Sequence, residues 1–386
     1  MGQPRAAEVQ SCRDRRVMVK FDTAGRQAYA WRSMSLPSPV PAPPPPVTSA
    51  QAPGAPATHP SDGRPEHNRI GLDFRRPVPR PKVRGRVIDF HCHLLSAGHA
   101  GPWFAAADHF GIDTFFSMQP LEEALRLKLA WGDRIHFIAV PAWRAIGTSG
   151  WLEDWQRRID GFYNLGSRIA KFHVAPQTIP RLGMGMDSPK FRKILKKVCD
   201  MGMIIMSHVG DPEIWYQTKY ADSAKFGTRQ EHYERWADAI DQVGRTPWVG
   251  AHLGGNPEDI PRLQALLDRF PNLWLDCSAT RWMQREVSAR RDAMRVFFIR
   301  NQDRILFGSD QVSGDDRGFD FYASRFWVHR KLWETAYVGE SPIHDPDLPT
   351  DAQPTLRGLC LPDPVLQKLY HDNAVRLMRS VGIDLA

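Results

Sequence analysis

This 386-residue sequence contains few cysteines and no long apolar run. The cysteines are odd in number and widely scattered, at Cys12, Cys92, Cys199, Cys277 and Cys360. That pattern favours free thiols in a reducing compartment over a disulfide framework. No apolar run approaches the roughly 18 residues of a membrane-spanning helix, and no apolar segment follows the N-terminal charges as it would in a secretory signal. We therefore expect a cytoplasmic protein with no membrane partner.

Most of the chain also lacks an excess of charge of either sign. The net charge is +8, but residues 1–86 alone hold 15 Lys and Arg against 6 Asp and Glu. The remaining residues hold 36 basic and 37 acidic side chains, a net charge of −1. A nucleic-acid-binding surface needs basic residues concentrated on the folded body, so we expect no nucleic-acid partner.

The N-terminal segment is rich in proline and poor in large apolar residues. Fourteen of the 32 prolines lie between Pro37 and Pro81, including the run PAPPPP at 41–46. Such a composition cannot bury enough surface to offset the entropy of ordering. We predict a disordered Pro- and Arg-rich extension over residues 1–70 and one folded domain over 71–386, in which residues 71–86 pack beside the first strand.

From residue 87 onward, short apolar runs alternate with amphipathic stretches. The predicted strands are 87–94, 112–118, 135–141, 168–174, 203–209, 248–253, 273–278 and 304–309, and the predicted helices include 120–130, 151–165, 189–200, 258–270 and 286–300. Strands that alternate with helices indicate a parallel sheet, and eight of them in about 300 residues predict a distorted (β/α)8 TIM barrel of the α/β class. An open doubly wound sheet is the alternative, but no glycine-rich phosphate loop follows any strand.

Polar side chains stand at the C-terminal ends of these apolar strands. The first strand, VIDFHCHL, places His91 and His93 on one face because side chains alternate along a strand. Later strands end in Lys171 and His173, His208, His252 and Asp310. In a barrel these ends meet at one mouth, where imidazole and carboxylate together suit zinc, iron or manganese.

The motifs that carry these residues resemble one family. They are DFHCH (89–93), AKFHVAP (170–176), MSHVGDP (206–212), GAHLGGNPED (250–259), RILFGSD (304–310) and YHDNAVRL (370–377). The chain from 87 to about 380 resembles the amidohydrolase superfamily, in particular the amidohydrolase-related group that includes aminocarboxymuconate-semialdehyde decarboxylase. The resemblance implies a single divalent metal, expected to be Zn²⁺ with Mn²⁺ or Fe²⁺ as alternatives, held by His91, His93, His208 and Asp310. It also implies that His252 is a catalytic acid or base.

Other residues near the strand ends are candidates for substrate binding. Asp310 could carry a proton between water and leaving group, and the His252 imidazole, if it titrates near neutrality as imidazoles ordinarily do, could act as a general base or polarise a carbonyl. Lys171 and His173 could contact substrate, although Lys171 also aligns with the carbamylated lysine of two-metal members of the superfamily. Arg281, and less strongly Arg285, could bind a carboxylate. Four tryptophans follow strand ends and could wall the mouth, namely Trp103, Trp143, Trp215 and Trp282.

Two long connections and three function classes complete the expectations. Residues 211–235 could form a lid over the metal, and residues 316–361 could close the pocket or form a homodimer contact. We expect a metal-dependent hydrolase that cleaves an amide, lactone or related C–N or C–O bond of a small carboxylated or cyclic substrate. The alternative is a non-oxidative decarboxylase or hydratase that uses the same metal, and the third possibility is a barrel without catalysis that serves as a scaffold.

Overall fold

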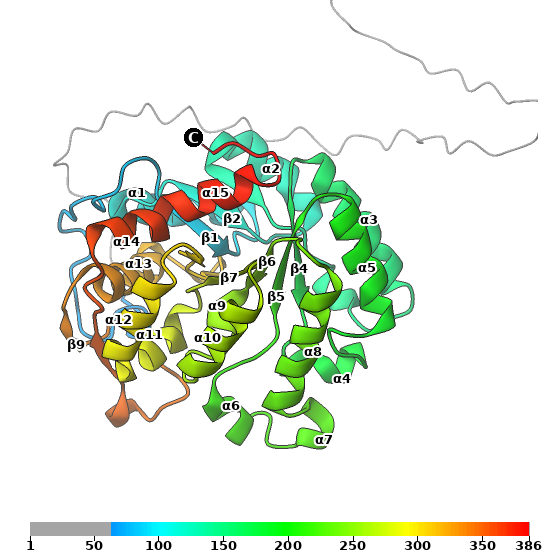
Figure 1. The fold of residues 1–386 in the computed structure, drawn as a ribbon. Coiled ribbons are helices and arrows are strands. Elements are labelled where there is room, and N and C mark those ends of the chain that lie inside the picture. The colour runs from blue at the N-terminus through cyan, green and yellow to red at the C-terminus, as the bar shows by residue number, and fades with distance from the viewer. Residues whose placement is uncertain (1–62, 386) are drawn as a thin grey trace, which may run out of the picture. The chain divides into compact units, whose positions relative to one another are not determined.

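Eight short parallel strands form the centre of the barrel, and the computed structural model describes residues 63–385 of the chain. The strands are β1 (Ile88–Cys92), β2 (Thr114–Ser117), β3 (Ile135–Phe137), β4 (Ile169–His173), β5 (Ile204–His208), β6 (Trp248–Gly250), β7 (Leu273–Asp276) and β8 (Ile305–Leu306). Each lies inside a segment predicted from sequence, and each is shorter than predicted because the ladder ends where the chain turns into a loop. Figure 1 shows strands in the middle and helices around them.

The barrel closes through two weak seams. The strands form one sheet in the order β1-β2-β3 and another in the order β4-β5-β6-β7-β8. Ala139 joins the sheets by accepting a hydrogen bond from the Lys171 amide and donating one to the Ile169 carbonyl, both at 2.8 Å. On the other side, Phe90 donates to the Phe307 carbonyl at 2.8 Å. The predicted (β/α)8 fold is therefore confirmed, with its distortion at these seams.

Helices connect the strands and cover them. They are α1 (Ala100–Phe110), α2 (Leu121–Trp131), α3 (Trp151–Asn164), α4 (Ile179–Leu182), α5 (Pro189–Asp200), α6 (Glu213–Gln217), α7 (Ser223–Phe226), α8 (Arg229–Gln242), α9 (Ala251–Gly254), α10 (Ile260–Arg269), α11 (Thr280–Ala289), α12 (Arg291–Arg300), α13 (Phe319–Glu334), α14 (Asp363–Gln367) and α15 (Asn373–Arg379). The predicted helix 189–200 is confirmed, and it begins where the Ser188 side chain caps the first turn before Pro189. The single helix predicted over 286–300 is wrong: two helices meet at Arg290, because α11 packs on α13 whereas α12 packs on α10.

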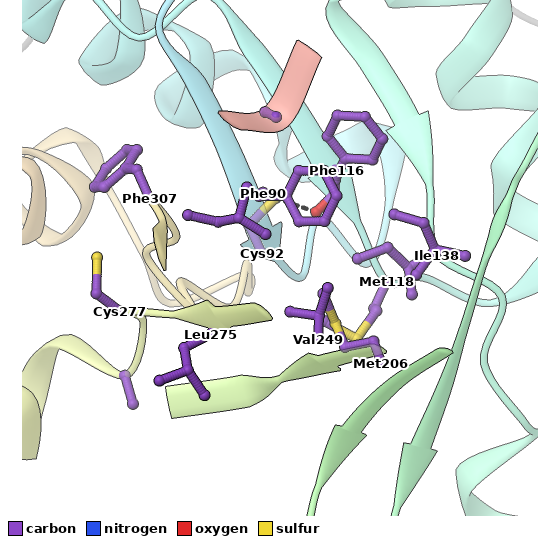
Figure 2. Packing of buried hydrophobic residues seen from close by; sticks show 14 of the residues in the cluster. Phe90, Cys92, Phe116, Met118, Ile138, Met206, Val249, Leu275, Cys277 and Phe307 are labelled. Atoms are coloured by element: carbon purple, nitrogen blue, oxygen red, sulfur yellow. Dashed lines mark hydrogen bonds between the residues drawn. The ribbon is translucent and has the colours of Figure 1, made fainter. Parts of the chain in front are cut away.

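The strands alternate between apolar and polar faces, as expected for β1. Phe90 and Cys92 are fully buried in the apolar core, together with Phe116 and Met206. Figure 2 shows side chains from successive strands meeting in this core. Cys92 and Cys277 are free, buried thiols, and burial raises the pKa of both well above its ordinary value. The alternation leaves the other face of β1 to its two histidines.

The two long connections carry structure of their own. The first, 211–235, contains α6, α7 and the start of α8, and the second, 316–361, contains α13 and the hairpin of β9 (Val338–Glu340) and β10 (Thr355–Arg357). The homodimer contact expected for the second stays a prediction. No helix within residues 63–385 is both long and apolar enough to cross a membrane.

The residues before β1 pack against the barrel. Phe74 lies in the core, and the Arg69 amide donates to the Pro342 carbonyl at 2.9 Å. The domain boundary at residue 70 stays a prediction, since most of the extension lies outside the described residues.

Candidate active site

A cavity of about 390 Å³ opens at the C-terminal ends of the strands. Of the candidates named from the sequence, Arg285 and Trp103 do not line it, and the following residues do: His91, His93, Trp143, Lys171, His173, His208, Trp215, His252, Arg281, Trp282 and Asp310. Its size is near the lower end of the roughly 300–1,000 Å³ found for small-molecule sites. The strand-end pattern therefore predicted residues that share one cavity, and their geometry indicates what each can do.

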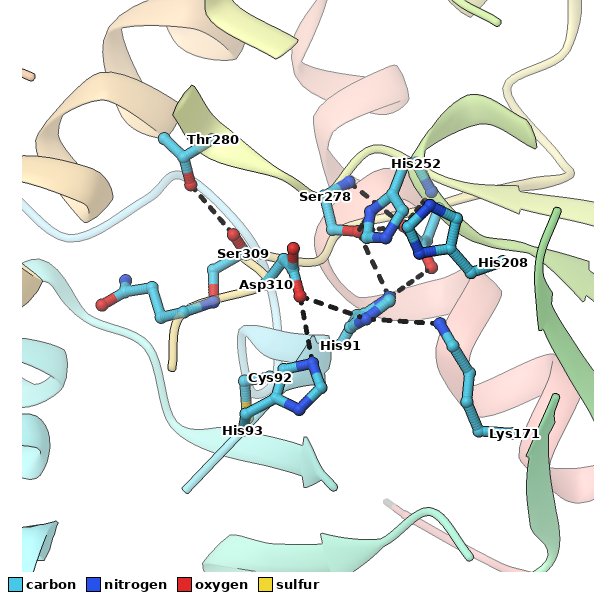
Figure 3. A network of polar contacts seen from close by, with 12 residues as sticks. His91, Cys92, His93, Lys171, His208, His252, Ser278, Thr280, Ser309 and Asp310 are labelled. Atoms are coloured by element: carbon cyan, nitrogen blue, oxygen red, sulfur yellow. Dashed lines mark hydrogen bonds and ion pairs between the residues drawn. The ribbon is translucent and has the colours of Figure 1, made fainter. Parts of the chain in front are cut away.

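Three side chains in this cavity have the spacing of a metal site. The Oδ1 atom of Asp310 lies 3.1 Å from His93 Nε2 and 3.4 Å from His91 Nε2. Figure 3 shows the three side chains pointing toward one another. Tetrahedral coordination at about 2.0–2.1 Å places ligand atoms roughly 3.3 Å apart, and two imidazoles with one carboxylate are a usual donor set for a divalent metal. The residues present fit a divalent metal ion.

His208 lies beside this group and has a different partner. Its Nε2 atom lies 2.9 Å from Asp211 Oδ1, and its ring centroid lies 4.5 Å from that of His252. Among the described residues, His208 belongs to neither group of side chains that could hold a metal. Its ligand role, implied by the resemblance, stays a prediction that requires its Nδ1 atom or a rotated ring.

Asp276, at the end of β7, orients His91 and was missed by the sequence reasoning. His91 Nδ1 donates to Asp276 Oδ2 at 2.8 Å, which leaves His91 Nε2 unprotonated and facing Asp310. Burial alone would raise the pKa of Asp276, but the charge and hydrogen bond of His91 hold it well below its ordinary value. Carboxylates behind ligating histidines fix ring orientation and tautomer in this way. The signal was a lone acidic residue in the apolar run LWLDCS.

A second group of possible ligands, His91, His252 and Asp276, is already occupied by internal hydrogen bonds. The Ser278 hydroxyl donates to Asp276 Oδ1, so it accepts a hydrogen bond from His252 Nδ1 at 2.7 Å. The His252 backbone amide also donates to Asp276 Oδ1, at 2.9 Å. These bonds leave His252 Nε2 as the nitrogen with a free lone pair.

His252 and Asp310 are both held in their proton-accepting forms. Burial, followed by the neighbouring His208, keeps the pKa of His252 well below its ordinary value. For Asp310, burial raises the pKa, but the hydrogen bond from His93 and nearby positive charge hold it well below its ordinary value. Both residues also have left-handed backbone angles, with φ of 58° and 53°. Such angles are costly for residues other than glycine and concentrate at functional sites.

Lys171 lies beside His91 of the His-His-Asp group. Its Nζ atom is 3.5 Å from His91 Nε2, and burial lowers its pKa to about 8. The amine therefore lies close enough to contact a substrate or a ligand, and the alternatives drawn from the sequence stay open.

The remaining predicted residues differ in their surroundings. Arg281 is exposed at the cavity, whereas Arg285 lies outside it and forms ion pairs with Glu286 and Asp345. Trp215 lines the cavity and donates to Asp347 at 2.6 Å. The mouth position expected for Trp103 is wrong, since it is fully buried in the core beside Phe115.

Comparison with known proteins gives the family. A model of the amidohydrolase family matches residues 156–379, more than half of the chain. The chain belongs to the amidohydrolase family. Its resemblance to this superfamily is thereby confirmed, and with the His-His-Asp group it places this amidohydrolase among the metal-dependent enzymes. No curated protein matches the chain.

Solved structures similar to this amidohydrolase are distant in sequence. A TIM-barrel protein from Bordetella bronchiseptica shares 15% identity, with 78% of this chain and 100% of that chain covered and a TM-score of 0.47. A 2,6-dihydroxybenzoate decarboxylase from Rhizobium shares 15% identity, with 78% and 100% covered and a TM-score of 0.43. A probable 2-pyrone-4,6-dicarboxylic acid hydrolase from Acinetobacter baumannii shares 14% identity, with 58% and 84% covered and a TM-score of 0.40.

Proposed function

We propose that this amidohydrolase is a hydrolase that uses one divalent metal ion to cleave an amide, lactone or related C–N or C–O bond of a small carboxylated or cyclic substrate. The observation that carries the proposal is the pair of proton acceptors, His252 and Asp310, on either side of His91 in one cavity. Hydrolysis requires a group that takes a proton from water while the substrate carbonyl is polarised.

His91, His93 and Asp310 would hold the metal, and His208 would complete the set after its ring leaves Asp211. When bound, a divalent ion supplies Lewis acidity, which polarises a substrate oxygen and makes water more acidic. We infer Zn²⁺ from the histidine-rich donor set, with Mn²⁺ or Fe²⁺ as alternatives. Asp276 keeps His91 Nε2 free for this purpose by accepting a hydrogen bond from the protonated Nδ1 atom.

His252 accepts the proton of water in this proposal. Ser278, whose hydroxyl donates to Asp276, accepts a hydrogen bond from the Nδ1–H group of the imidazole, so that Nε2 takes the proton and later returns it to the leaving group. Asp310 is the second site where a proton can rest. Lys171 and His173 would contact the substrate from β4.

A decarboxylase acting on an aromatic acid is the second candidate. Trp143, Trp215, Trp282 and Phe321 line the cavity, and aromatic walls suit a planar ring. We place it second because hydrolysis is the commonest chemistry of the superfamily that the chain resembles.

The experiment follows the two products. Metal-loaded protein is incubated in ¹⁸O-labelled water with a panel of lactones, amides and carboxylated aromatics, and mass spectrometry detects the products. Incorporation of ¹⁸O into a ring-opened or cleaved product supports the hydrolase, whereas release of carbon dioxide together with a decarboxylated product that carries no ¹⁸O supports the second candidate. A double change of His91 and His93 to Ala should abolish both metal content and turnover, and His109→Ala at the end of α1 serves as the control. Equal metal content in the double variant and the wild type would contradict the site.

A cytoplasmic location is part of the proposal. The four cysteines within residues 63–385 are all free thiols, which suits a reducing compartment. Separation of cell fractions, with antibody detection of the full chain, tests the location.

A further inference from the structure

We propose that Arg281, Arg317 and Arg325 form a carboxylate-binding subsite in the cavity, which holds a carboxylate of the substrate that does not itself react. The proposal rests on the cavity being the active site and names the charged group of its substrate. The three residues come from different parts of the chain: Arg281 lies in α11, Arg317 in the loop before α13, and Arg325 in α13. All three line the same cavity as the His-His-Asp group.

Two of the three guanidinium groups, those of Arg317 and Arg325, lie over one aromatic ring, and Arg281 lines the cavity beside them. The Cζ atoms of Arg325 and Arg317 lie 3.5 and 4.6 Å from the centre of the Phe321 ring. Burial, and then the charges of Arg281 and Arg317, lower the pKa of Arg325 to about 9. Contacts with the ring face hold the cations in place, but they do not remove the repulsion between like charges.

Within residues 63–385, the carboxylate that pairs with this cluster is the exposed one of Asp316. Among the residues that the structure describes, Arg325 donates hydrogen bonds only to the Phe321 carbonyl and the Ser324 hydroxyl, although the residue is only 8% exposed. Arg317 lies 3.8 Å from Asp316, which also pairs with Arg64 and is 68% exposed. Within residues 63–385, the Arg281 side chain makes neither a hydrogen bond nor an ion pair. Because a buried guanidinium without an anion is costly, an anionic ligand would compensate it.

An unpartnered buried amide in the same cavity points independently to a ligand. Gln311 is 2% exposed, and both its Oε1 and its Nε2 atoms lack a hydrogen-bond partner. It follows Asp310 directly and precedes Val312, whose carbonyl accepts a hydrogen bond from Arg317. A buried amide of this kind is normally satisfied, and a carboxylate bound by the arginines would accept from its Nε2 atom.

The charge of the cavity favours an anion. Its lining holds four basic side chains, Lys171 and the three arginines, against two acidic ones, Asp211 and Asp310. Both acidic groups are engaged, Asp211 with His208 and Tyr220 and Asp310 with His93. A cavity lined by one sign of charge raises the local concentration of opposite charge, and paired guanidinium groups match the two oxygens of a carboxylate.

The test is binding of benzoate to the metal-free full chain, measured by titration calorimetry at fixed ionic strength. Benzamide, which has the same shape without the charge, and inorganic phosphate are titrated in parallel. We expect benzoate to bind and benzamide to bind at least about tenfold more weakly, because charge-assisted hydrogen bonds are roughly twice as strong as neutral ones. Binding without metal separates this subsite from the reaction, so failure of the proposed hydrolysis would leave the result intact.

Matched variants assign the binding to the three arginines. Arg281→Gln and Arg325→Gln should each weaken benzoate about tenfold, whereas Arg245→Gln makes the same change of charge in the exposed loop before β6 and should match the wild type. If Arg325→Gln does not fold, as judged by its melting curve, Arg317→Gln and Arg325→Lys replace it, and both should weaken benzoate. Unchanged benzoate affinity in the folded variants, or equal binding of benzamide and benzoate, would overturn the subsite. Tighter binding of phosphate than of benzoate would overturn its assignment to a carboxylate.

Discussion

At the scale of single residues, the cavity concentrates backbone angles that are unfavourable elsewhere. His252, Leu253, Ala279 and Asp310 all have positive φ angles at the ends of β6, β7 and β8. Such angles typically cost on the order of 1–3 kcal/mol each and persist where the surroundings impose them. The hydrogen bond from the His252 amide to Asp276 is one such constraint. The chain therefore gives up stability to aim two side chains into one cavity.

The first prediction separates the roles of two neighbouring histidines. His252→Asn should keep the bound metal and lower turnover by about 10²–10⁴, since it removes a proton acceptor. His208→Asn should lose metal and activity together, as the family resemblance implies. Elemental analysis beside a rate measurement on the substrate found by the ¹⁸O panel makes the comparison. Equal loss of metal in both variants would show that His252 is a ligand.

The second prediction concerns acid stability and a histidine outside the cavity. Burial lowers the pKa of His136 in β3 to about 4, below its value of about 6.5 in an unfolded chain. Between these values the unfolded state binds more protons, so this residue makes the protein less stable as pH falls from 6.5 toward 4. His136→Phe preserves the stacking on Phe116, with ring centroids 4.9 Å apart, and removes the titration.

The measurement is urea unfolding at pH 7 and pH 5. The wild type should lose more unfolding free energy than His136→Phe over this interval, by on the order of 1.4 kcal/mol per pH unit at most. His344→Phe removes a histidine elsewhere and serves as the control. Identical pH dependence in wild type and His136→Phe would refute the prediction.

The residues that reasoning from sequence found and missed differ in one respect. His91, His93, His208 and His252 interrupt apolar strands, so their positions stand out in the sequence. Arg317 and Arg325 belong to a long connection, and Arg325 reaches the cavity only because α13 packs beside the mouth. Their contribution depends on tertiary packing, which no local pattern encodes.

At the scale of elements, the segment 211–235 is attached beside the cavity by two carboxylates, those of Glu258 and Asp347. Asp347 accepts hydrogen bonds from Trp215 Nε1 at 2.6 Å and from Lys219 Nζ at 2.8 Å. The Lys219 ammonium also lies 3.4 Å from the centre of the Trp215 ring. The segment expected from sequence to form a lid is thus ordered and specifically attached, and its role as a lid stays a prediction.

The third prediction is that Asp347→Asn loosens this lid. The change weakens two hydrogen bonds and an ion pair at a side chain that is 8% exposed, so local opening should become easier by about 1–3 kcal/mol. Limited proteolysis should cut within residues 213–228 several-fold faster, while cutting elsewhere stays the same. Asp351→Asn, an exposed acidic residue nearby, is the control. Unchanged cutting in this segment would show that other contacts hold the lid.

Elements were predictable where their patterns are amphipathic. The eight strands and α5 have clear apolar runs or periodicity, and all were found. Helix α13 was missed within 316–361, because most of its residues are buried on every side and its sequence lacks a polar face. The seams between β3 and β4 and between β8 and β1 depend on closure of the barrel, which strand-by-strand reasoning does not contain.

At the scale of the whole molecule, the residues just before the predicted domain boundary contact the cavity wall. His67 is 4% exposed, and its ring centroid lies 5.0 Å from that of Phe321, the ring beneath Arg317 and Arg325. The Arg69 guanidinium donates to the Ser341 carbonyl at 3.0 Å. The segment 63–70 therefore braces the part of the barrel that carries the arginines.

The fourth prediction compares two truncations. A chain that starts at residue 63 should fold, bind metal and melt like the full chain, because the composition of residues 1–62 offers no core. A chain that starts at residue 71 should fold and bind metal but melt several degrees lower, since the contacts of His67 and Arg69 are removed. Calorimetric melting and metal content measure both. Aggregation or loss of metal in the chain from 63 would show that the extension is structural.

The residues that could hold the metal also close the barrel. The Asp310 amide donates to the His91 carbonyl and the His93 amide donates to the Gln311 carbonyl, both at 2.7 Å, across the seam between β8 and β1. The same residues thus gather their side chains at the cavity and join β8 to β1 through their backbones. An ion bound by the three side chains would therefore stabilise the backbone hydrogen bonds of this seam. By thermodynamic linkage, an intact seam would in turn favour binding of the ion. Chelation should therefore speed hydrogen exchange at these two amides well before it affects the seam at Ala139.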